Sequence, residues 1–258
     1  MLAATSLASA QAPRPDAEWR DAGIVFTHRS PQARLRPVPV RAVKLGAGFW
    51  AARVQANRRR SLPSLWQLLE EHGVVDNFRR VSGRKQAPRR GPLYTDSDLF
   101  KWMEAAAFTL QTDNDAELRA QLDKAIDEVL AAQQPDGYLN TYYILERANE
   151  RFTDFRRGHE LYCLGHLIQA ALAHHRATGE RKLLDAALRY ADYVVATLGP
   201  DKKPALTGHP ELEMALVELY RTTGNRSYLR FAGYVLSGVE RERLQVSDRD
   251  VIYMFRGI

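Results

Sequence analysis

The sequence predicts an all-helical chain assembled from pairs of helices. From about residue 50 onward, apolar residues recur at the three- and four-residue spacing of a helix, as they do across residues 160–177. The same part of the chain shows no alternating pattern of a half-buried strand. Residues 177–184 also resemble residues 222–229 at an offset of 45. Two helices in each 45–50 residues are typical of a helical-hairpin array.

The predicted helices follow one another along the chain. They cover residues 52–71, 97–111, 115–133, 160–177, 180–198, 210–222 and 225–238. Gly179 and Gly224 stand where helices end, because glycine adopts the left-handed backbone of that position at no steric cost. Residues 135–137, Pro-Asp-Gly, predict a turn. Such hairpins form either an open solenoid scaffold or a closed α/α toroid, in which polar residues at the starts of inner helices line a central pocket.

A less regular segment precedes the helices. Residues 1–39 are interpreted as a signal-like, extended lead-in rich in proline and arginine, and a short strand is predicted around residues 38–43. The predicted domains are therefore this lead-in and a helical body over residues 40–258. Residues 10–12, Ala-Gln-Ala, have the form of a signal-peptidase site, which favours a periplasmic or secreted protein. A disordered tail on a cytoplasmic protein is the alternative interpretation.

Composition excludes several classes of protein. Apolar residues make up 45% of the 258 residues and charged residues 26%, which excludes a disordered chain and a collagen-like repeat. No apolar run approaches the length of a membrane-spanning helix, so no membrane partner is predicted. The single cysteine, Cys163, excludes an internal disulfide and a zinc site built on several thiolates. Because Cys163 lies in an apolar helical pattern, we expect a buried, inert thiol and no metal in this chain.

The net charge of +6 is unevenly distributed. Residues 1–90 carry +11 and residues 91–258 carry −5. A basic third of a chain can bind nucleic acid, but here the basic residues are scattered and few aromatic residues lie among them to stack on bases. We interpret them as a solvated face with basic loops, and we predict no nucleic-acid partner.

Two histidines are the first candidates for a binding site. His159 and His209 each follow a glycine, each stands near a glutamate (Glu160 and Glu211), and each precedes a helix at an equivalent position of the repeat. A single histidine at a helix start is usually a capping or surface residue, whereas a repeated one indicates converging polar groups. A neutral imidazole offers one donor and one acceptor, which suits a sugar hydroxyl. His166, two turns after His159, is interpreted as a packed core residue.

Two further residues complete the predicted sugar-binding set. Asp98 stands in the first turn of a predicted helix with Trp102 on the same face, and Asn140 follows the predicted turn in a loop rich in tyrosine. Asn can bind adjacent hydroxyl groups and aromatic rings stack on sugar faces. Structural roles compete with these: Asp98 stabilises a helix start, and Asn140 belongs to a packed loop. Phosphate-binding glycine loops, HExxH and GxSxG motifs are absent from the sequence.

Taken in order, several short blocks make the chain resemble the β-L-arabinofuranosidases of glycoside hydrolase family 127. The match runs from about Val40 to Gly257. Its blocks are Gly-Phe-Trp at 48–50, Gly-Val-Val-Asp-Asn-Phe at 73–78, the Asp-Ser-Asp segment at 96–105, the Gln-Pro-Asp-Gly segment at 132–141, His-Glu-Leu-Tyr at 159–162, Gly-His-Leu-Ile at 165–168 and Gly-His-Pro-Glu-Leu-Glu at 208–213. Each block alone is weak, and their shared order makes the resemblance specific.

The resemblance implies an (α/α)6 toroid and a glycosidase that cleaves with retention at the anomeric carbon. A zinc-bound cysteine thiolate would be the nucleophile and a glutamate the general acid. The histidines that match His159 and His209 would contact arabinofuranose. The family's nucleophile, general acid and zinc ligands are expected beyond residue 258, so the resemblance implies an incomplete toroid, inactive alone, with zinc only in the full-length enzyme. The remaining alternatives are another toroid enzyme, such as an unsaturated glucuronyl hydrolase or an epimerase, and a non-catalytic scaffold.

Overall fold

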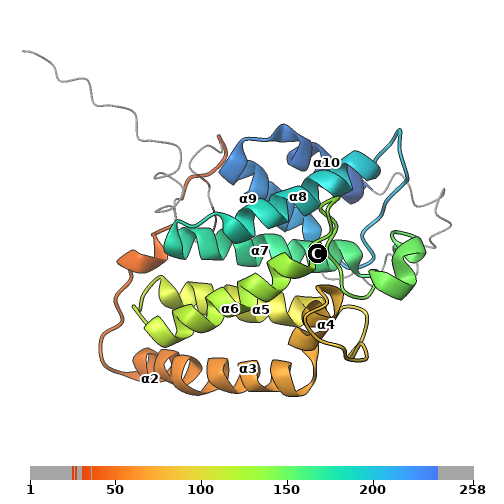
Figure 1. The fold of residues 1–258 in the computed structure, drawn as a ribbon. Coiled ribbons are helices and arrows are strands. Elements are labelled where there is room, and N and C mark those ends of the chain that lie inside the picture. Colours follow the sequence, from red (N-terminus) through yellow and green to blue (C-terminus); the bar gives the residue numbers. More distant parts are fainter. Residues whose placement is uncertain (1–24, 26, 28–30, 36, 238–258) are drawn as a thin grey trace, which may run out of the picture.

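The computed structural model describes residues 25, 27, 31–35 and 37–237 (Figure 1). In this part of the chain, regular structure is helical apart from one isolated bridge between Leu198 and Lys203. The elements in chain order are η1 (Val40–Ala42), α2 (Phe49–Ala56), η2 (Asn57–Ser61), α3 (Leu62–Glu71), α4 (Val74–Val81), α5 (Asp96–Leu110), α6 (Ala116–Ala132), η3 (Leu145–Glu150), α7 (Glu160–Thr178), α8 (Lys182–Thr197), α9 (Leu212–Thr223) and α10 (Arg226–Ser237).

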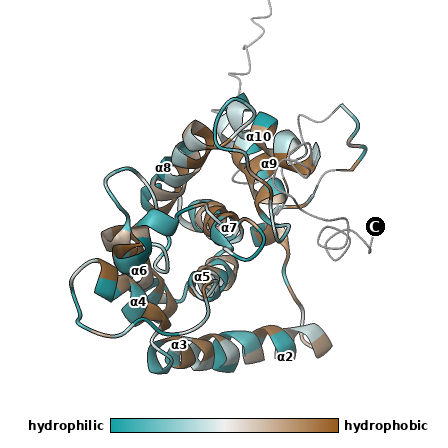
Figure 2. Cartoon of the chain, turned by 90° about the vertical axis from the view of Figure 1, so that its right-hand side faces the viewer, coloured by the Kyte–Doolittle hydropathy of each residue, from teal (hydrophilic) through white to brown (hydrophobic). Residues whose placement is uncertain are grey.

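The helices form two curved layers of hairpins. Helices α5, α7 and α9 pack in succession in the inner layer, and each is followed along the chain by a partner, α6, α8 and α10, in the outer layer. Helices α3 and α4 precede them, with α3 against α5 and α4 against α6. Figure 2 looks along α5 and α7 and shows α4, α6 and α8 on one side of them. The described residues therefore form an arc of helix pairs, and the prediction of an incomplete helical toroid is confirmed.

Helix α7 is the centre of the core. Unlike an amphipathic surface helix, it buries apolar residues around its whole circumference, because α5, α8 and α9 all pack against it. The predicted helix ends after α7 and α9 are also confirmed. Gly179 and Gly224 follow the two helices with φ angles of 78° and 76°, and each donates its N–H to the carbonyl four residues earlier.

Three local predictions need correction. The strand predicted around residues 38–43 is wrong: the 3-10 helix η1 forms there, and Ala42 donates its N–H to Pro39 O at 2.9 Å. The single helix predicted over residues 52–71 contains the π segment η2, because Pro63 has no N–H for the carbonyl four residues earlier. Helix α4 was not predicted, because four of its eight residues are charged or polar and eight residues are too few to show a clear helical period.

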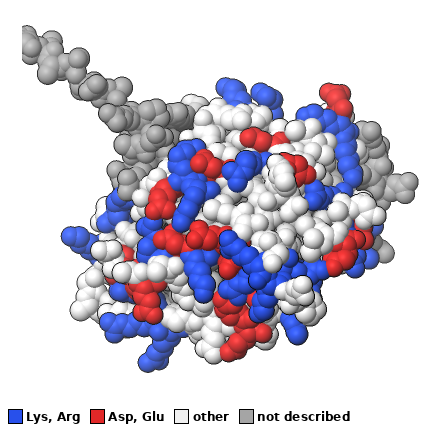
Figure 3. All heavy atoms as spheres, in the orientation of Figure 1, with Lys and Arg blue, Asp and Glu red and all other residues white. Residues whose placement is uncertain are grey.

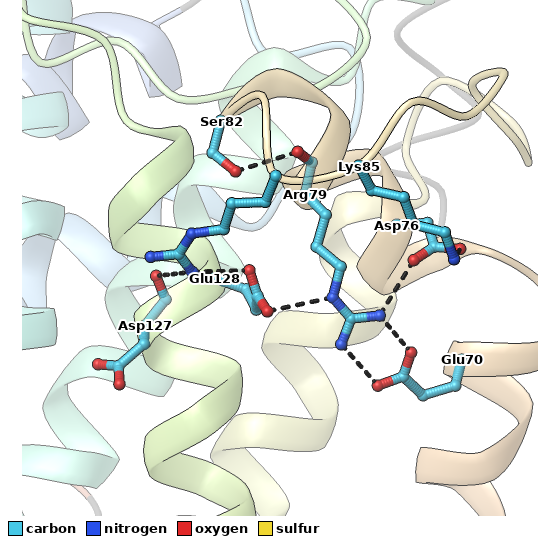
Figure 4. Close-up of polar contacts among 8 residues, drawn as sticks. Glu70, Asp76, Arg79, Ser82, Lys85, Asp127 and Glu128 are labelled. Carbon is cyan, nitrogen blue, oxygen red and sulfur yellow. Dashed lines mark hydrogen bonds and ion pairs between the residues drawn. The ribbon is translucent and has the colours of Figure 1, made fainter.

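A network of ion pairs joins the first helices to the outer layer. Arg79 on α4 binds Glu70 on α3 with both terminal nitrogens, at 2.6 and 2.9 Å, and its Nε lies 3.1 Å from Glu128 on α6 (Figure 4). Asp76 also binds Arg79, at 3.0 Å, and accepts a 2.7 Å contact from Lys85. Bidentate pairs of arginine and carboxylate fix orientation as well as distance, so this network sets how α3, α4 and α6 meet. Figure 3 shows that basic and acidic side chains are also mixed over the rest of the face seen in Figure 1.

Two buried carboxylates attach the long loop between α6 and α7, residues 133–158, to the starts of the inner helices. Asp96, in the first turn of α5, is completely buried and accepts the backbone N–H of Thr141 at 2.6 Å and its hydroxyl at 2.5 Å. Glu160, the first residue of α7, accepts the hydroxyl of Tyr138 at 2.5 Å and the N–H of Phe152 at 2.7 Å. Burial nevertheless raises the pKa of both carboxyl groups, Glu160 to about 7.

Two predictions concern a signal-peptidase site near the N-terminus and a membrane-spanning helix. The signal-peptidase-like residues 10–12 lie outside the described residues. Among the helices that the structure describes, none combines the length and the apolar character needed to cross a bilayer.

The attachment at Asp96 predicts a large effect of one substitution on stability. Asp96→Ala should lower the free energy of unfolding by about 3 kcal/mol, because two donors of Thr141 lose their acceptor inside the core at roughly 1–3 kcal/mol each. Urea unfolding measures the change. Asp98→Ala is the matched control, since Asp98 is exposed in the same helical turn. This substitution should lower the free energy of unfolding by under about 1 kcal/mol. Equal effects of the two substitutions would contradict the attachment.

Candidate functional site

The candidate site is built around the start of α7. His159 directly precedes that helix and has a φ of 52°, a left-handed backbone that is uncommon outside glycine. Its carbonyl accepts the N–H of Cys163 at 2.9 Å and so begins the hydrogen bonding of the helix. The half-buried imidazole places Nδ1 2.6 Å from the carbonyl of Arg157. This conformation turns the ring away from the regular path of the helix.

His209 reaches the same place from the loop before α9. Gly208 packs so closely on the loop after η3 that a Cβ atom there would lie 2.1 Å from the carbonyl oxygen of Phe155 and 2.7 Å from that of Arg156. Only glycine allows this approach. As a result, the ring centroids of His159 and His209 lie 5.9 Å apart. The two Gly-His pairs therefore bring their imidazoles together, and what they bind stays a prediction.

Two tyrosines join the two histidines. The ring of Tyr94 lies 5.2 Å from that of His159, and the ring of Tyr162 lies 4.6 Å from that of His209, between centroids. Lys101 on α5 donates to the Tyr162 hydroxyl at 2.8 Å and thereby orients it. We call Tyr94, His159, Tyr162 and His209 the aromatic cluster. It gathers residues from the starts of α5, α7 and α9 at one end of the inner layer.

The aromatic cluster has the chemistry of a sugar-binding surface. Because a carbonyl can only accept, the Nδ1 atom of His159 carries a proton, and in the neutral ring Nε2 is left as an acceptor for a hydroxyl group. The neighbouring aromatic faces offer apolar area for the C–H face of a sugar. A small pocket opens here between the two histidines, lined also by Asp154, Leu206 and Gly208.

A second polar group lies beside the cluster on the inner face. His166 is 9% exposed, its ring lies 4.6 Å from Tyr162, and its Nδ1 is 3.4 Å from Glu211 Oε1. Neither atom of that pair has a hydrogen-bond partner among the described residues. Burial, together with the charges of Glu104 and Glu213, raises the pKa of Glu211 to about 7, and burial lowers that of His166 to about 4.

The contact between His166 and Glu211 depends on a small residue in α7. A Cβ atom on Gly165 would lie 2.7 Å from Cγ of Glu211 and 3.0 Å from the N atom of Leu212. The glycine therefore allows the start of α9 to settle onto α7. His166 is buried, as predicted for a core residue, and it lies next to the aromatic cluster.

Comparisons with known proteins identify the family of this chain. The family model described as "Beta-L-arabinofuranosidase, GH127 catalytic domain" matches residues 42–246. The chain belongs to the GH127 family of glycoside hydrolases. A curated "Non-reducing end beta-L-arabinofuranosidase" of Bifidobacterium longum subsp. longum is 38% identical over 169 residues, which cover 63% of this chain and 26% of that protein.

Solved GH127 structures show the same arrangement of helices. The GH127 β-L-arabinofuranosidase of Geobacillus stearothermophilus T6 superposes with a TM-score of 0.73 at 40% identity over 75% of this chain. A second GH127 β-arabinofuranosidase gives a TM-score of 0.74 at 37% identity over 78% of this chain. The matches cover 32% and 34% of the two structures, so the chain spans about a third of the length of these GH127 relatives and about a quarter of the curated one.

The other two predicted sugar ligands of this GH127 chain are Asp98 and Asn140. Asp98 is exposed in the first turn of α5, and burial of part of its surface raises its pKa. Asn140 is completely buried, and its Oδ1 accepts the N–H of Tyr142 at 3.1 Å. Neither takes part in the ring contacts of the aromatic cluster. Their roles in binding stay predictions.

The structure also locates the side chains that bear on metal binding. Cys163 is fully buried on α7, and burial raises the pKa of its thiol well above the usual range. A buried, protonated thiol is a poor nucleophile and a poor zinc ligand. Three other side chains, Asp123, His174 and Glu180, each place one potential ligand atom within 4.8 Å of the others. Because Asp123 lies far from the other two in the sequence, the three form no motif from which this group could be predicted.

The raised pKa of Glu211 predicts a pH-dependent effect on stability. Because its folded-state pKa of about 7 exceeds the ordinary 4.5, its contribution to stability is present at low pH and is lost as the pH rises through about 7. As the pH rises from 5 to 8, the free energy of unfolding of Glu211→Gln should therefore increase by on the order of 2 kcal/mol relative to that of the parent protein.

Urea unfolding of both proteins at the two pH values measures this difference. The comparison must be made between variant and parent, because the lowered pKa of His166 has the opposite effect on the parent protein: stability is lost as the pH falls from 6.5 to about 4. A difference between the two proteins that is the same at pH 5 and pH 8 would show that Glu211 titrates normally.

Proposed function

We propose that this chain supplies sugar recognition in a retaining β-L-arabinofuranosidase that acts on arabinofuranose-containing glycans. The observation that supports this most is the convergence of His159 and His209, at 5.9 Å between ring centroids, from two equivalent repeats. A scaffold has no need of two imidazoles at matching helix starts. The names of the GH127 relatives support arabinofuranose as the sugar.

In this proposal the aromatic cluster binds and orients the terminal sugar. Nε2 of His159 accepts a hydroxyl proton, and the left-handed backbone holds the ring in place for it. Tyr94 and Tyr162 cover the apolar face of the sugar ring and exclude water from it. Lys101 holds the Tyr162 hydroxyl and is within reach of a sugar oxygen next to it. Asp98 and Asn140 are retained as proposed secondary contacts.

The bond-breaking step is not assigned to the described residues. The family resemblance implies a zinc-bound thiolate, but Cys163 does not fit that role, because it is fully buried and its Sγ lies 3.7 Å from the carbonyl oxygen of Tyr94. We therefore propose that zinc and the nucleophile belong to the part of the relatives' length that this chain does not cover. This chain alone is expected to bind the sugar without cleaving it.

Ligand titration of the 258-residue chain tests the proposal. Methyl β-L-arabinofuranoside should shift the imidazole NMR signals of His159 and His209, and replacing either histidine by alanine should weaken binding by about tenfold or more, as expected for a lost hydrogen bond of about 1.4 kcal/mol. Circular dichroism should show unchanged helix content, because the two side chains line a surface rather than fill the core.

Two controls make the result specific. His72→Ala changes an exposed histidine outside the aromatic cluster and should bind like the parent chain. An unsaturated glucuronide should bind far more weakly than the arabinofuranoside. Preference for the glucuronide would favour the alternative toroid enzyme, and unchanged affinity in the His159→Ala/His209→Ala double variant would remove the aromatic cluster from sugar binding.

A further inference from the structure

A group of metal-binding side chains lies at the opposite end of α7 from the aromatic cluster. Asp123 on α6, His174 on α7 and Glu180 in the turn before α8 place one ligand atom each within 4.8 Å of the others. His174 is 15 residues along the helix from His159, which is roughly 22 Å at 1.5 Å per residue. The group is therefore separate from the proposed sugar site.

His174 is the unusual member of this group. It is completely buried, and neither ring nitrogen has a hydrogen-bond partner among the described residues. A buried polar group without a partner costs free energy, so such a group in a native core needs an explanation. In its neutral form the ring has a nitrogen lone pair to offer to a metal ion.

The two carboxylates are already in contact with cations. Arg119 bonds Asp123 through Nε at 3.0 Å and also pairs with Glu180. Nζ of Lys182 lies 3.0 Å from Asp123 and 3.8 Å from Glu180. Lys182 is the first residue of α8, and its side chain is 34% exposed, so it can turn into solvent at little cost. The ammonium thus stands between the two carboxylates, where a cation is favoured.

We propose that Asp123, His174 and Glu180 bind a divalent transition metal ion, of which Zn²⁺ is the probe, in exchange for the Lys182 ammonium. One imidazole nitrogen and two carboxylate oxygens are a ligand set that Zn²⁺ accepts, with water as the fourth ligand. The ion would satisfy the buried imidazole, which the ammonium leaves without a bond. Because the ligands come from α6, α7 and the turn before α8, the ion stabilises the packing of these elements and takes no part in sugar chemistry.

Calorimetric titration of the metal-free 258-residue chain with ZnCl₂ tests the site. We expect one ion per chain, a micromolar or tighter Kd, and a rise in melting temperature of roughly 5 °C at saturation. His174→Ala and Glu180→Gln should each weaken binding at least tenfold. Lys182→Met should strengthen it, because the competing ammonium is gone.

The controls exclude other sites and misfolding. Asp127→Asn removes a carboxylate 3.9 Å from the same Lys182 but outside the ligand group, and should bind zinc like the parent. The double variant His159→Ala/His209→Ala should also bind zinc, because these two imidazoles lie at the opposite end of α7 from His174. If His174→Ala fails to fold, the exposed Glu180→Gln variant decides the question. No saturable binding, or the same Kd in Glu180→Gln as in the parent, would overturn the proposal.

Discussion

The attachment of the 133–158 loop to Asp96 and Glu160 is the interaction on which the candidate site depends. Both carboxylates stand in the first turn of an inner helix, and both accept two hydrogen bonds from the loop. A loop of this length would otherwise be free to move. Because it is fixed, it presents a firm backbone surface on which Gly208 can dock and bring His209 toward His159.

The burial of Asp96 and Glu160 and the left-handed backbone of His159 both cost free energy. Burial raises the pKa of Asp96 and Glu160, and the hydrogen bonds from the loop act in the opposite direction because they stabilise the charged form. The left-handed backbone of His159 adds a strain of order 1 kcal/mol. Such strain persists only where the surroundings hold it. The loop on one side and the rigid helix α7 on the other provide that support, so the imidazole is oriented before any ligand arrives.

Much of the fold could be predicted because helix periodicity and glycine stops are local signals. The repeat singled out His159 and His209, and the structure brings their rings within 5.9 Å of each other, while their role in binding stays a prediction. Other features depend on approach between distant segments. The closeness of Glu211 to His166 follows from Gly165, and the group around His174 joins residues 51 positions apart, from Asp123 to His174, so no spacing rule finds either. The short helix Val74–Val81 buries Val74, Val75 and Phe78, but eight residues are too few to show a clear helical period in the sequence.

Native-state amide hydrogen exchange on the 258-residue chain tests the central claim most directly. The N–H groups of Thr141 and Phe152 lie in the loop, outside any helix, and donate to the buried carboxylates of Asp96 and Glu160. The account predicts that these two amides exchange as slowly as those in the core of α7, because they are released only when the fold opens as a whole. Exchange as fast as in an exposed turn would show that the loop is not held and that the two histidines are not oriented by it.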